Sequence, residues 1–462
     1  MKTPTQLFLV IALCLLPAAG RGVSNSGVPA KTEAVKDGYE LLARRNYPQA
    51  EAMFRSVLVA EPHSVPAARG LALALWDEGK RTEAVQEFTV AARLSPDDFQ
   101  AHYDLAKAAW DVAEQLTPPS AGNTTSALQV QAAGYQQLAI SEMRRAQALR
   151  PKDANVLLSL AQLYFDGGKP KDALTQAAQA ARLDPSNPAV FVTLGQAYQA
   201  QGNEVQAAAE YQKAIQISPH DPDSYVALGE LRARAGNLSE AEELLRSAIQ
   251  ADPTSAPAYA VLGQLLLEAH DQTQAQNLLT HAVTLNPNDW ESQYWLGKAL
   301  AEAGRFDQAR ALFEKALALH PDFPEAREQL AFQMLRRGNM AGAEAQAQAI
   351  FTQNPQSLEG HQVMALALWK QRDYDGSLAE CAQALNSNPH SPRTLAIQAL
   401  DLWQQRRRAD ARRALITAGK LQPKILSSSV FCRLILCDAK DVSIVSDFLQ
   451  KNHWILTPPP DY

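Results

Sequence analysis

The sequence predicts an all-α protein: a solenoid of about eleven helix-turn-helix repeats that ends in a C-terminal helical cap. Proline recurs with a fixed period, and nine of the ten gaps in the series are 34 residues long. Twelve residues before each proline stands a small residue, Ser377 in one repeat and alanine in the others. Between these positions apolar residues follow three- and four-residue spacings, which are typical of amphipathic helices. A fixed period over most of the chain indicates a repeat architecture rather than the three domains that 462 residues first suggest. The prolines are Pro62, Pro96, Pro151, Pro185, Pro219, Pro253, Pro287, Pro321, Pro355, Pro389 and Pro423.

The N-terminal segment has the layout of an export signal. Lys2 precedes an unbroken apolar run, Leu7–Leu16, and small residues follow it up to Gly20. Ten apolar residues are too few to span a bilayer, which needs about 20. We therefore expect residues 1–20 to be a signal peptide, residues 21–30 to be a linker, and the protein to be periplasmic or secreted.

The repeats are expected to fill residues 31–423. In each repeat a short polar turn, such as Gln201-Gly202-Asn203, separates two helices. The proline ends the second helix because it has no N–H group and disfavours helix at the residue before it. The third repeat, residues 99–153, carries 21 extra residues between its helices. We expect either a lengthened helix pair or a projection that binds a partner.

Residues 424–462 follow the last repeat. They are expected to form two short helices that cover the apolar face of the final repeat, since the end of a solenoid otherwise exposes such a face.

This pattern resembles the tetratricopeptide repeat family, whose period is 34 residues. Leu296-Gly297 followed by Ala309, Phe313 and Pro321 is one good match to the family pattern. The resemblance implies that the helix pairs wind into a right-handed superhelix. It also implies that the first helix of each repeat lines the concave face through its second, fifth, ninth and twelfth positions.

Aromatic residues gather at these positions near both ends of the array, and four of the seven tryptophans occupy the twelfth position. Two interpretations stay open: the rings line a binding groove, or they seal helix–helix contacts in the core. Tryptophan and tyrosine are favoured at interfaces, so we predict a partner-binding groove. Its predicted residues are Tyr39, Trp76, Tyr103, Trp110, Phe165, Tyr294, Phe332, Trp369 and Trp403.

Composition and motifs argue against several other functions. The net charge of −6 is unlike that of a nucleic-acid-binding domain, which normally carries a basic excess. No HExxH motif, CxxC pair or glycine-rich phosphate loop is present, so no metal, cofactor or catalytic site is expected. No segment after the apolar run Leu7–Leu16 is apolar enough to cross a membrane.

We therefore predict an exported, non-catalytic scaffold that binds protein or peptide partners through the concave face, in envelope assembly or secretion. A carbohydrate- or polymer-binding module that uses the groove aromatics is one alternative. A non-catalytic subunit of an enzyme complex is another.

Cations also recur near the inter-helix turns of three late repeats, either because they favour helix C-termini or because they bind an acidic partner. They are Arg336, Arg337, Lys370, Arg372, Arg406, Arg407 and Arg408.

Overall fold

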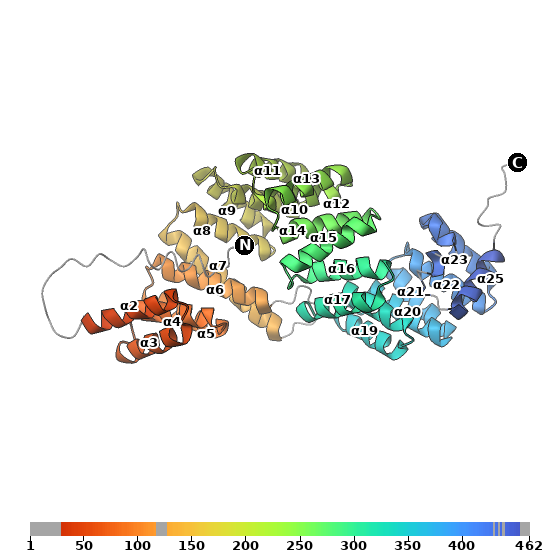
Figure 1. The fold of residues 1–462 in the computed structure, drawn as a ribbon, viewed down its shortest axis with the longest axis horizontal. Helices are drawn as coiled ribbons and strands as arrows, with labels where there is room; N and C mark the ends of the chain where they lie inside the picture. The colour runs from red at the N-terminus through yellow and green to blue at the C-terminus, as the bar shows by residue number, and fades with distance from the viewer. Residues whose placement is uncertain (1–28, 117–126, 428–429, 433–434, 437–438, 453–462) are drawn as a thin grey trace. The chain divides into compact units, whose positions relative to one another are not determined.

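The structure, a computed structural model, describes residues 29–116, 127–427, 430–432, 435–436 and 439–452. The chain divides into two compact units; Figure 1 labels the helices. We call the described residues up to Leu231 the N-terminal unit and those from Arg232 onward the C-terminal unit. The predicted signal peptide, most of the predicted linker, the tip of the insertion and the last ten residues lie outside the described residues.

Helices account for nearly all of the described chain. Those that begin in the N-terminal unit are α2 (Pro29–Ala43), α3 (Tyr47–Ala60), α4 (Val65–Asp77), α5 (Arg81–Leu94), α6 (Phe99–Leu116), α7 (Ala127–Leu149), α8 (Ala154–Asp166), α9 (Pro170–Leu183), α10 (Pro188–Ala200), α11 (Glu204–Ile217) and α12 (Pro222–Arg234). The C-terminal unit holds α13 (Leu238–Ala251), α14 (Ala256–Glu268), α15 (Gln272–Leu285), α16 (Trp290–Glu302), α17 (Phe306–Leu319), α18 (Pro324–Arg336), α19 (Met340–Gln353), α20 (Leu358–Gln371), α21 (Tyr374–Ser387), α22 (Pro392–Gln404), α23 (Arg408–Leu421), the short 3₁₀ helix η1 (Pro423–Leu426) and α25 (Ala439–Gln450). The predicted all-α fold of successive helix pairs is confirmed.

The two turns of each repeat explain the sequence pattern. Between α10 and α11, Gly202 has φ of +76°, a left-handed conformation that glycine adopts without steric cost. The Gly202 N–H donates to the Gln199 carbonyl at 2.9 Å and the Asn203 N–H donates to the Tyr198 carbonyl at 2.9 Å, which together end the helix. At the end of α11, the C-cap residue Ser218 has φ of −131° and ψ of 88°, outside the helical region that a residue before proline avoids.

The small residue in each first helix marks a close approach between the two helices of a pair. A Cβ atom added at Gly195 would lie 2.3 Å from the ring of Tyr211, and one added at Gly297 would lie 2.7 Å from the ring of Phe313. Both rings are buried. The large residue of the second helix therefore fills the space that the small residue of the first helix leaves open.

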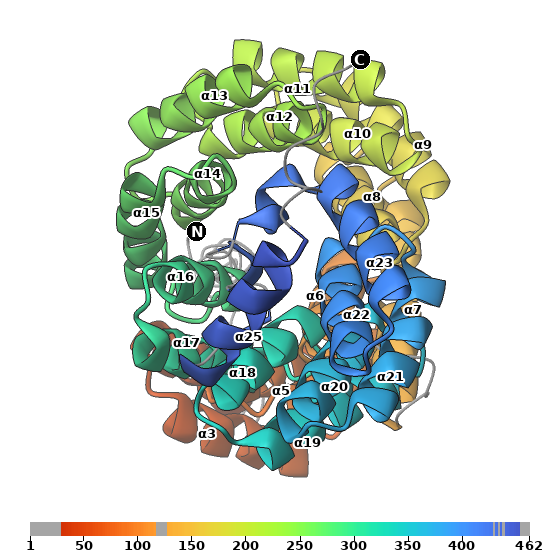
Figure 2. The same ribbon diagram turned by 90° about the vertical axis from the view of Figure 1, so that its right-hand side faces the viewer.

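First helices of neighbouring repeats contact one another, as α18 does with α20 and α20 with α22. Figure 2 shows α14 and α16 on the inner side of the C-terminal unit and α15 on its outer side. We call the surface formed by α16, α18, α20 and α22 the first-helix surface of the C-terminal unit. Its side chains come from equivalent positions of successive repeats, so they form rows across the unit.

One boundary differs from that expected, and the third repeat has the lengthened helix pair that was one of the two expectations. Helix α2 begins at Pro29, inside the predicted linker, because the fixed φ of proline suits the first turn of a helix. In the third repeat α6 has 18 residues and α7 has 23, compared with 13 in α4 and 14 in α5. The insertion therefore lengthens both helices of this pair, and residues 117–126 between them are outside the described residues.

The C-terminal segment packs on the last repeats, with α25 beside α22 and α23 (Figure 1). Its buried residues Phe431, Val445 and Phe448 join the same hydrophobic cluster as Leu400 and Leu415. Of the two short helices expected here, the first is observed as the 3₁₀ helix η1, with residues 430–432 also helical, and the second is α25. No helix in the described part of the chain is both long and apolar enough to cross a membrane.

Candidate binding surface

The predicted aromatic residues of the N-terminal unit lie in one hydrophobic cluster, apart from Phe165, which is half-buried outside it. Trp76 and Trp110 are 8% and 7% exposed. The Arg81 guanidinium lies 5.2 Å from the ring centre of Trp76, and the Trp110 indole N–H donates to Glu114 Oε1 at 3.0 Å. These two rings are therefore largely covered.

Two tyrosines of this unit are more accessible. The Tyr39 ring packs edge-on against Phe54, and its hydroxyl donates to the Pro66 carbonyl at 2.9 Å. Burial raises the pKa of Tyr39 to about 12, so this hydroxyl is a permanent donor at neutral pH. Tyr103 stacks on Phe99 at 5.6 Å between ring centres and is half-buried. Both tyrosines already have partners within the unit.

The predicted aromatic residues of the C-terminal unit are also covered. Trp369 is 1% exposed, and Phe332 and Tyr294 are 3% and 8% exposed. Trp403 is half-buried, with its ring 5.3 Å from that of Phe448 in α25. The structure therefore brings Phe332, Trp369 and Trp403 into one cluster with the C-terminal segment. A binding role for these rings stays a prediction.

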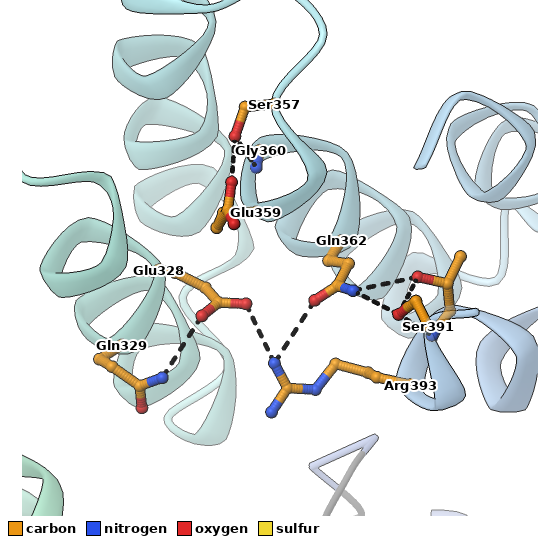
Figure 3. A network of polar contacts seen from close by, with 9 residues as sticks. Glu328, Gln329, Ser357, Glu359, Gly360, Gln362, Ser391 and Arg393 are labelled. Carbon is orange, nitrogen blue, oxygen red and sulfur yellow. Dashed lines mark hydrogen bonds and ion pairs between the residues drawn. The ribbon is translucent and has the colours of Figure 1, made fainter. Parts of the chain in front are cut away.

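A polar network that the sequence analysis missed crosses three first helices of the C-terminal unit (Figure 3). Arg393 of α22 donates through Nη1 to Glu328 Oε1 of α18 at 3.0 Å and to Gln362 Oε1 of α20 at 3.5 Å. The guanidinium carbon of Arg393 also lies 4.4 Å from the ring centre of Phe332. One arginine thus ties together three consecutive repeats.

The helix starts fix this network in place. Ser357 and Ser391 are the N-cap residues of α20 and α22, and their hydroxyls accept from backbone N–H groups three residues on. Gln362 Nε2 donates to Ser391 Oγ at 2.8 Å and to Thr394 Oγ1 at 3.0 Å. The amide of Gln362 is therefore held on both sides, with its carbonyl oxygen toward Arg393 (Figure 3).

Burial changes the electrostatics of this network. Burial raises the pKa of Glu328 to about 6, although the Arg393 guanidinium favours its charged form. Burial also raises the pKa of Tyr294, and Glu328 raises it further. Arg393 Nε is buried without a hydrogen-bond partner in the described part of the chain. Arg393 is the most exposed member of this arrangement, with 25% of its side chain exposed, whereas Glu328 and Tyr294 are each 8% exposed.

The N-terminal unit has a related pair between two neighbouring first helices. Arg69 of α4 donates to Asp104 Oδ2 of α6 through Nη2 at 2.6 Å and through Nε at 3.1 Å. Gln100 Nε2 donates to the other oxygen, Oδ1, at 2.6 Å. Asp104 is fully buried, and burial raises its pKa although Arg69 opposes the shift. Because all of these partners are satisfied within the unit, the pair is suited to holding the two helices together.

A signal for the C-terminal network did exist in the sequence. Glu328 and Gln362 occupy the fifth position of their first helices, and Arg393 occupies the second. A comparison of the second and fifth positions of successive first helices for polar residues, and not for aromatic residues alone, would have selected Glu328, Gln362 and Arg393. The aromatic pattern drew attention to positions that the core uses.

The described residues contain no group of three or more His, Cys, Asp or Glu side chains placed to hold a metal ion.

Comparison with family models gives a match to the tetratricopeptide repeat over residues 36–99 and 71–113. The model of the C-terminal domain of cilia and flagella-associated protein 70, itself made of these repeats, matches residues 119–366, more than half of the chain. The chain belongs to the tetratricopeptide repeat family.

Solved structures with the tetratricopeptide repeat fold are similar to this chain. The Cut9–Hcn1 hetero-tetramer of the APC/C gives a TM-score of 0.50 at 15% identity, covering 92% of this chain and 96% of the other. Pseudomonas aeruginosa pilF is 23% identical over 45% of this chain and 94% of its own, with a TM-score of 0.41. Yeast Tom70 is 14% identical over 88% of this chain and 99% of its own, with a TM-score of 0.41.

No curated protein matches the sequence significantly. The likeness to Cut9–Hcn1 shows the fold alone, and tetratricopeptide repeats are typically protein-interaction scaffolds.

Proposed function

We propose that the protein is an exported scaffold that binds a protein or peptide partner on the first-helix surface of the C-terminal unit. The observation that carries this proposal is the network of Glu328, Gln362 and Arg393, which places polar groups in a row across α18, α20 and α22. Rows that cross successive repeats suit an extended peptide, because neighbouring side chains of the peptide meet equivalent positions of neighbouring repeats.

Preorganisation supports this role. The Arg393 guanidinium is fixed by Glu328, by Gln362 and by the face of Phe332, so little side-chain freedom is lost when a partner binds. Arginine beside aromatic rings in a desolvated setting is typical of interface hot spots. A backbone carbonyl or carboxylate of the partner is the natural acceptor for the remaining N–H groups of Arg393.

The covering of the tryptophans favours a peptide over a sugar as the ligand. Stacking on a sugar needs an open ring face, whereas Trp76, Trp110 and Trp369 are each less than one-tenth exposed.

Export is proposed from the sequence alone, from Lys2 and the apolar run Leu7–Leu16. A scaffold outside the cytoplasm would act in envelope assembly or secretion.

The test is affinity capture from the native host with the mature chain, followed by binding of the recovered partner to purified variants. Arg393→Gln should weaken binding by about 2 kcal/mol, roughly 30-fold, as for a hot spot. Arg413→Gln is the matched control, because Arg413 lies on α23 and its side chain is 78% exposed. A folded Arg393→Gln variant that binds the partner as tightly as the unmodified chain would overturn the proposal.

A further inference from the structure

The inter-helix turns of three late repeats carry cations, and in the first two of these turns carboxylates of the chain itself pair with them. Arg337 forms an ion pair with Asp307. Lys370 Nζ lies 2.6 Å from Asp441 Oδ2, and Arg372 Nη2 lies 3.8 Å from Asp441 Oδ1. Pairs within the chain therefore account for these three cations.

The third turn, between α22 and α23, differs because two of its cations have no such pair. It holds Arg406, Arg407 and Arg408, the only three consecutive Lys or Arg residues in the sequence, and all three are exposed. Asp410 Oδ2 accepts from Arg407 Nε at 3.1 Å and Nη2 at 2.9 Å, and Asp410 Oδ1 pairs with Arg413. Asp410 is thus occupied, while Arg406 and Arg408 form no ion pair with any residue that the structure describes.

The neighbours of this turn leave the charges of Arg406 and Arg408 uncompensated. The guanidinium carbon of Arg408 lies 4.8 Å from the ring centre of Trp403, which is a neutral partner. In the preceding repeat, Asp375 Oδ1 accepts from Gln405 Nε2 at 2.6 Å rather than from an arginine. A carboxylate from another molecule would therefore complete the turn.

Folding forces within the turn do not account for these arginines. Arg406 has φ of +62°, in the left-handed region, where six other repeats have glycine at the equivalent position. Arg407 is the N-cap residue and Arg408 the first residue of α23, at the positive end of the helix dipole, which disfavours cations. The turn thus carries a steric and an electrostatic cost, and such costs are typical of sites that serve a function.

The turn adjoins the surface on which a partner is proposed to bind. Trp403, the ring beneath Arg408, is the twelfth residue of α22 and belongs to the first-helix surface of the C-terminal unit. The whole chain has a net charge of −6, so an extended anionic surface such as a membrane would repel much of it. A short acidic segment of a protein contacts the turn alone and avoids this repulsion.

We propose that Arg406 and Arg408 bind two carboxylates of an acidic segment in a protein partner, each through the fork of N–H groups that a guanidinium presents. The proposal rests on the proposed scaffold function and names the chemistry of one part of the partner. Arg407 and Arg413 stay on Asp410 and lie outside this site.

The first test uses the mature chain, with a fluorescein-labelled peptide of six glutamates as the probe. Fluorescence anisotropy should show saturable binding that weakens as salt is added. A peptide of six glutamines should bind at least about ten-fold more weakly. Equal binding of the two peptides, or no binding of the glutamate peptide, would overturn the proposal.

Variants of the chain locate the site. Arg406→Gln and Arg408→Gln should each lower the affinity for the glutamate peptide about three-fold, and the double variant about ten-fold. The matched control, Arg44→Gln with Arg145→Gln, removes the same charge from side chains of the N-terminal unit that are 76% and 66% exposed. An equal loss of affinity in the control and in the double variant would indicate unspecific attraction and would overturn the proposal.

Arg406→Gly separates binding from folding. Glycine adopts the left-handed conformation without steric cost, so the Tm should not fall, while the affinity should fall about three-fold as for Arg406→Gln. A lower Tm with unchanged affinity would make Arg406 a structural residue and would contradict the proposal.

Vesicles of phosphatidylglycerol test a membrane as the occupant. The mature chain should not sediment with them. Sedimentation with the vesicles that the double variant abolishes would identify an anionic lipid surface as the occupant, and the proposal would then be wrong.

Failure of this inference can be told apart from failure of the scaffold function. If the double variant binds the recovered partner as tightly as the unmodified chain does, while Arg393→Gln weakens that binding, only this inference is wrong. If neither variant weakens binding of the recovered partner, both proposals are wrong.

Discussion

Asp401 gives the sharpest prediction about stability. This carboxyl group of α22 is fully buried, and its Oδ2 accepts from Ser377 Oγ of α21 at 2.7 Å. Its Oδ1 has no hydrogen-bond partner in the described part of the chain. Burial raises the pKa of Asp401 to about 8, although the Ser377 hydrogen bond opposes this and Asp373 adds to it. The folded protein therefore keeps Asp401 protonated at pH values where the unfolded chain has lost that proton.

The sign of the pH dependence follows directly. Between about pH 4 and pH 8 the folded state binds one more proton at Asp401 than the unfolded state, so this group makes stability fall as pH rises. The slope is about 1.4 kcal/mol per pH unit. Asp401→Asn removes the titration while keeping the shape of the side chain. Its stability relative to the unmodified chain should therefore increase steadily from pH 5 to pH 8.

The assay is hydrogen exchange measured on peptides from α21 and α22, compared between the two chains at each pH. A local measurement is needed because long repeat arrays unfold in more than one step. Asp447→Asn is the matched control, since Asp447 is an exposed residue of α25 paired with Lys451. A difference between Asp401→Asn and the unmodified chain that does not grow with pH would refute the reasoning.

Three further predictions concern packing and the buried ion pair. Gly297→Val should destabilise its repeat by about 1–3 kcal/mol, because the added atoms meet the ring of Phe313, and chemical denaturation monitored by circular dichroism would detect this. Trp369→Ala should cost about 3–5 kcal/mol of stability as a core truncation, and a small change in thermal melting would instead indicate a ring that lines a groove. Lys370→Ala should cost about 3–5 kcal/mol by removing the cation 2.6 Å from the buried Asp441, since the Arg372 guanidinium lies farther from it at 3.8 Å. A double-mutant cycle of Lys370 and Asp441 would be additive if the two residues did not interact.

Much of the fold could be predicted from the sequence because the same local sequence pattern recurs in every repeat. The 34-residue proline period, the small residue of each first helix and the polar turns all report local geometry. Gly195 and Gly297, for example, are small because a ring from the second helix occupies the space beside them. Such short-range constraints appear directly in the spacing of residues.

The candidate site could be predicted only in part. The equivalent positions on successive first helices could be identified from the sequence. The burial of their side chains could not, because it depends on how closely neighbouring repeats approach. Trp403 illustrates this, because the ring that covers it, Phe448, lies 45 positions later in a segment outside the repeat pattern. The pairing of Lys370 with Asp441 has the same origin: 71 residues separate them, and no periodicity relates them.

The most direct test of the central claim is a hydrogen-exchange footprint of the partner bound to the mature chain. If the first-helix surface of the C-terminal unit is the binding site, protection should appear in α18, α20 and α22, around Glu328, Gln362 and Arg393. The second helices α19, α21 and α23 should exchange as they do in the unbound chain. Protection confined to those second helices, or to the N-terminal unit, would contradict the account.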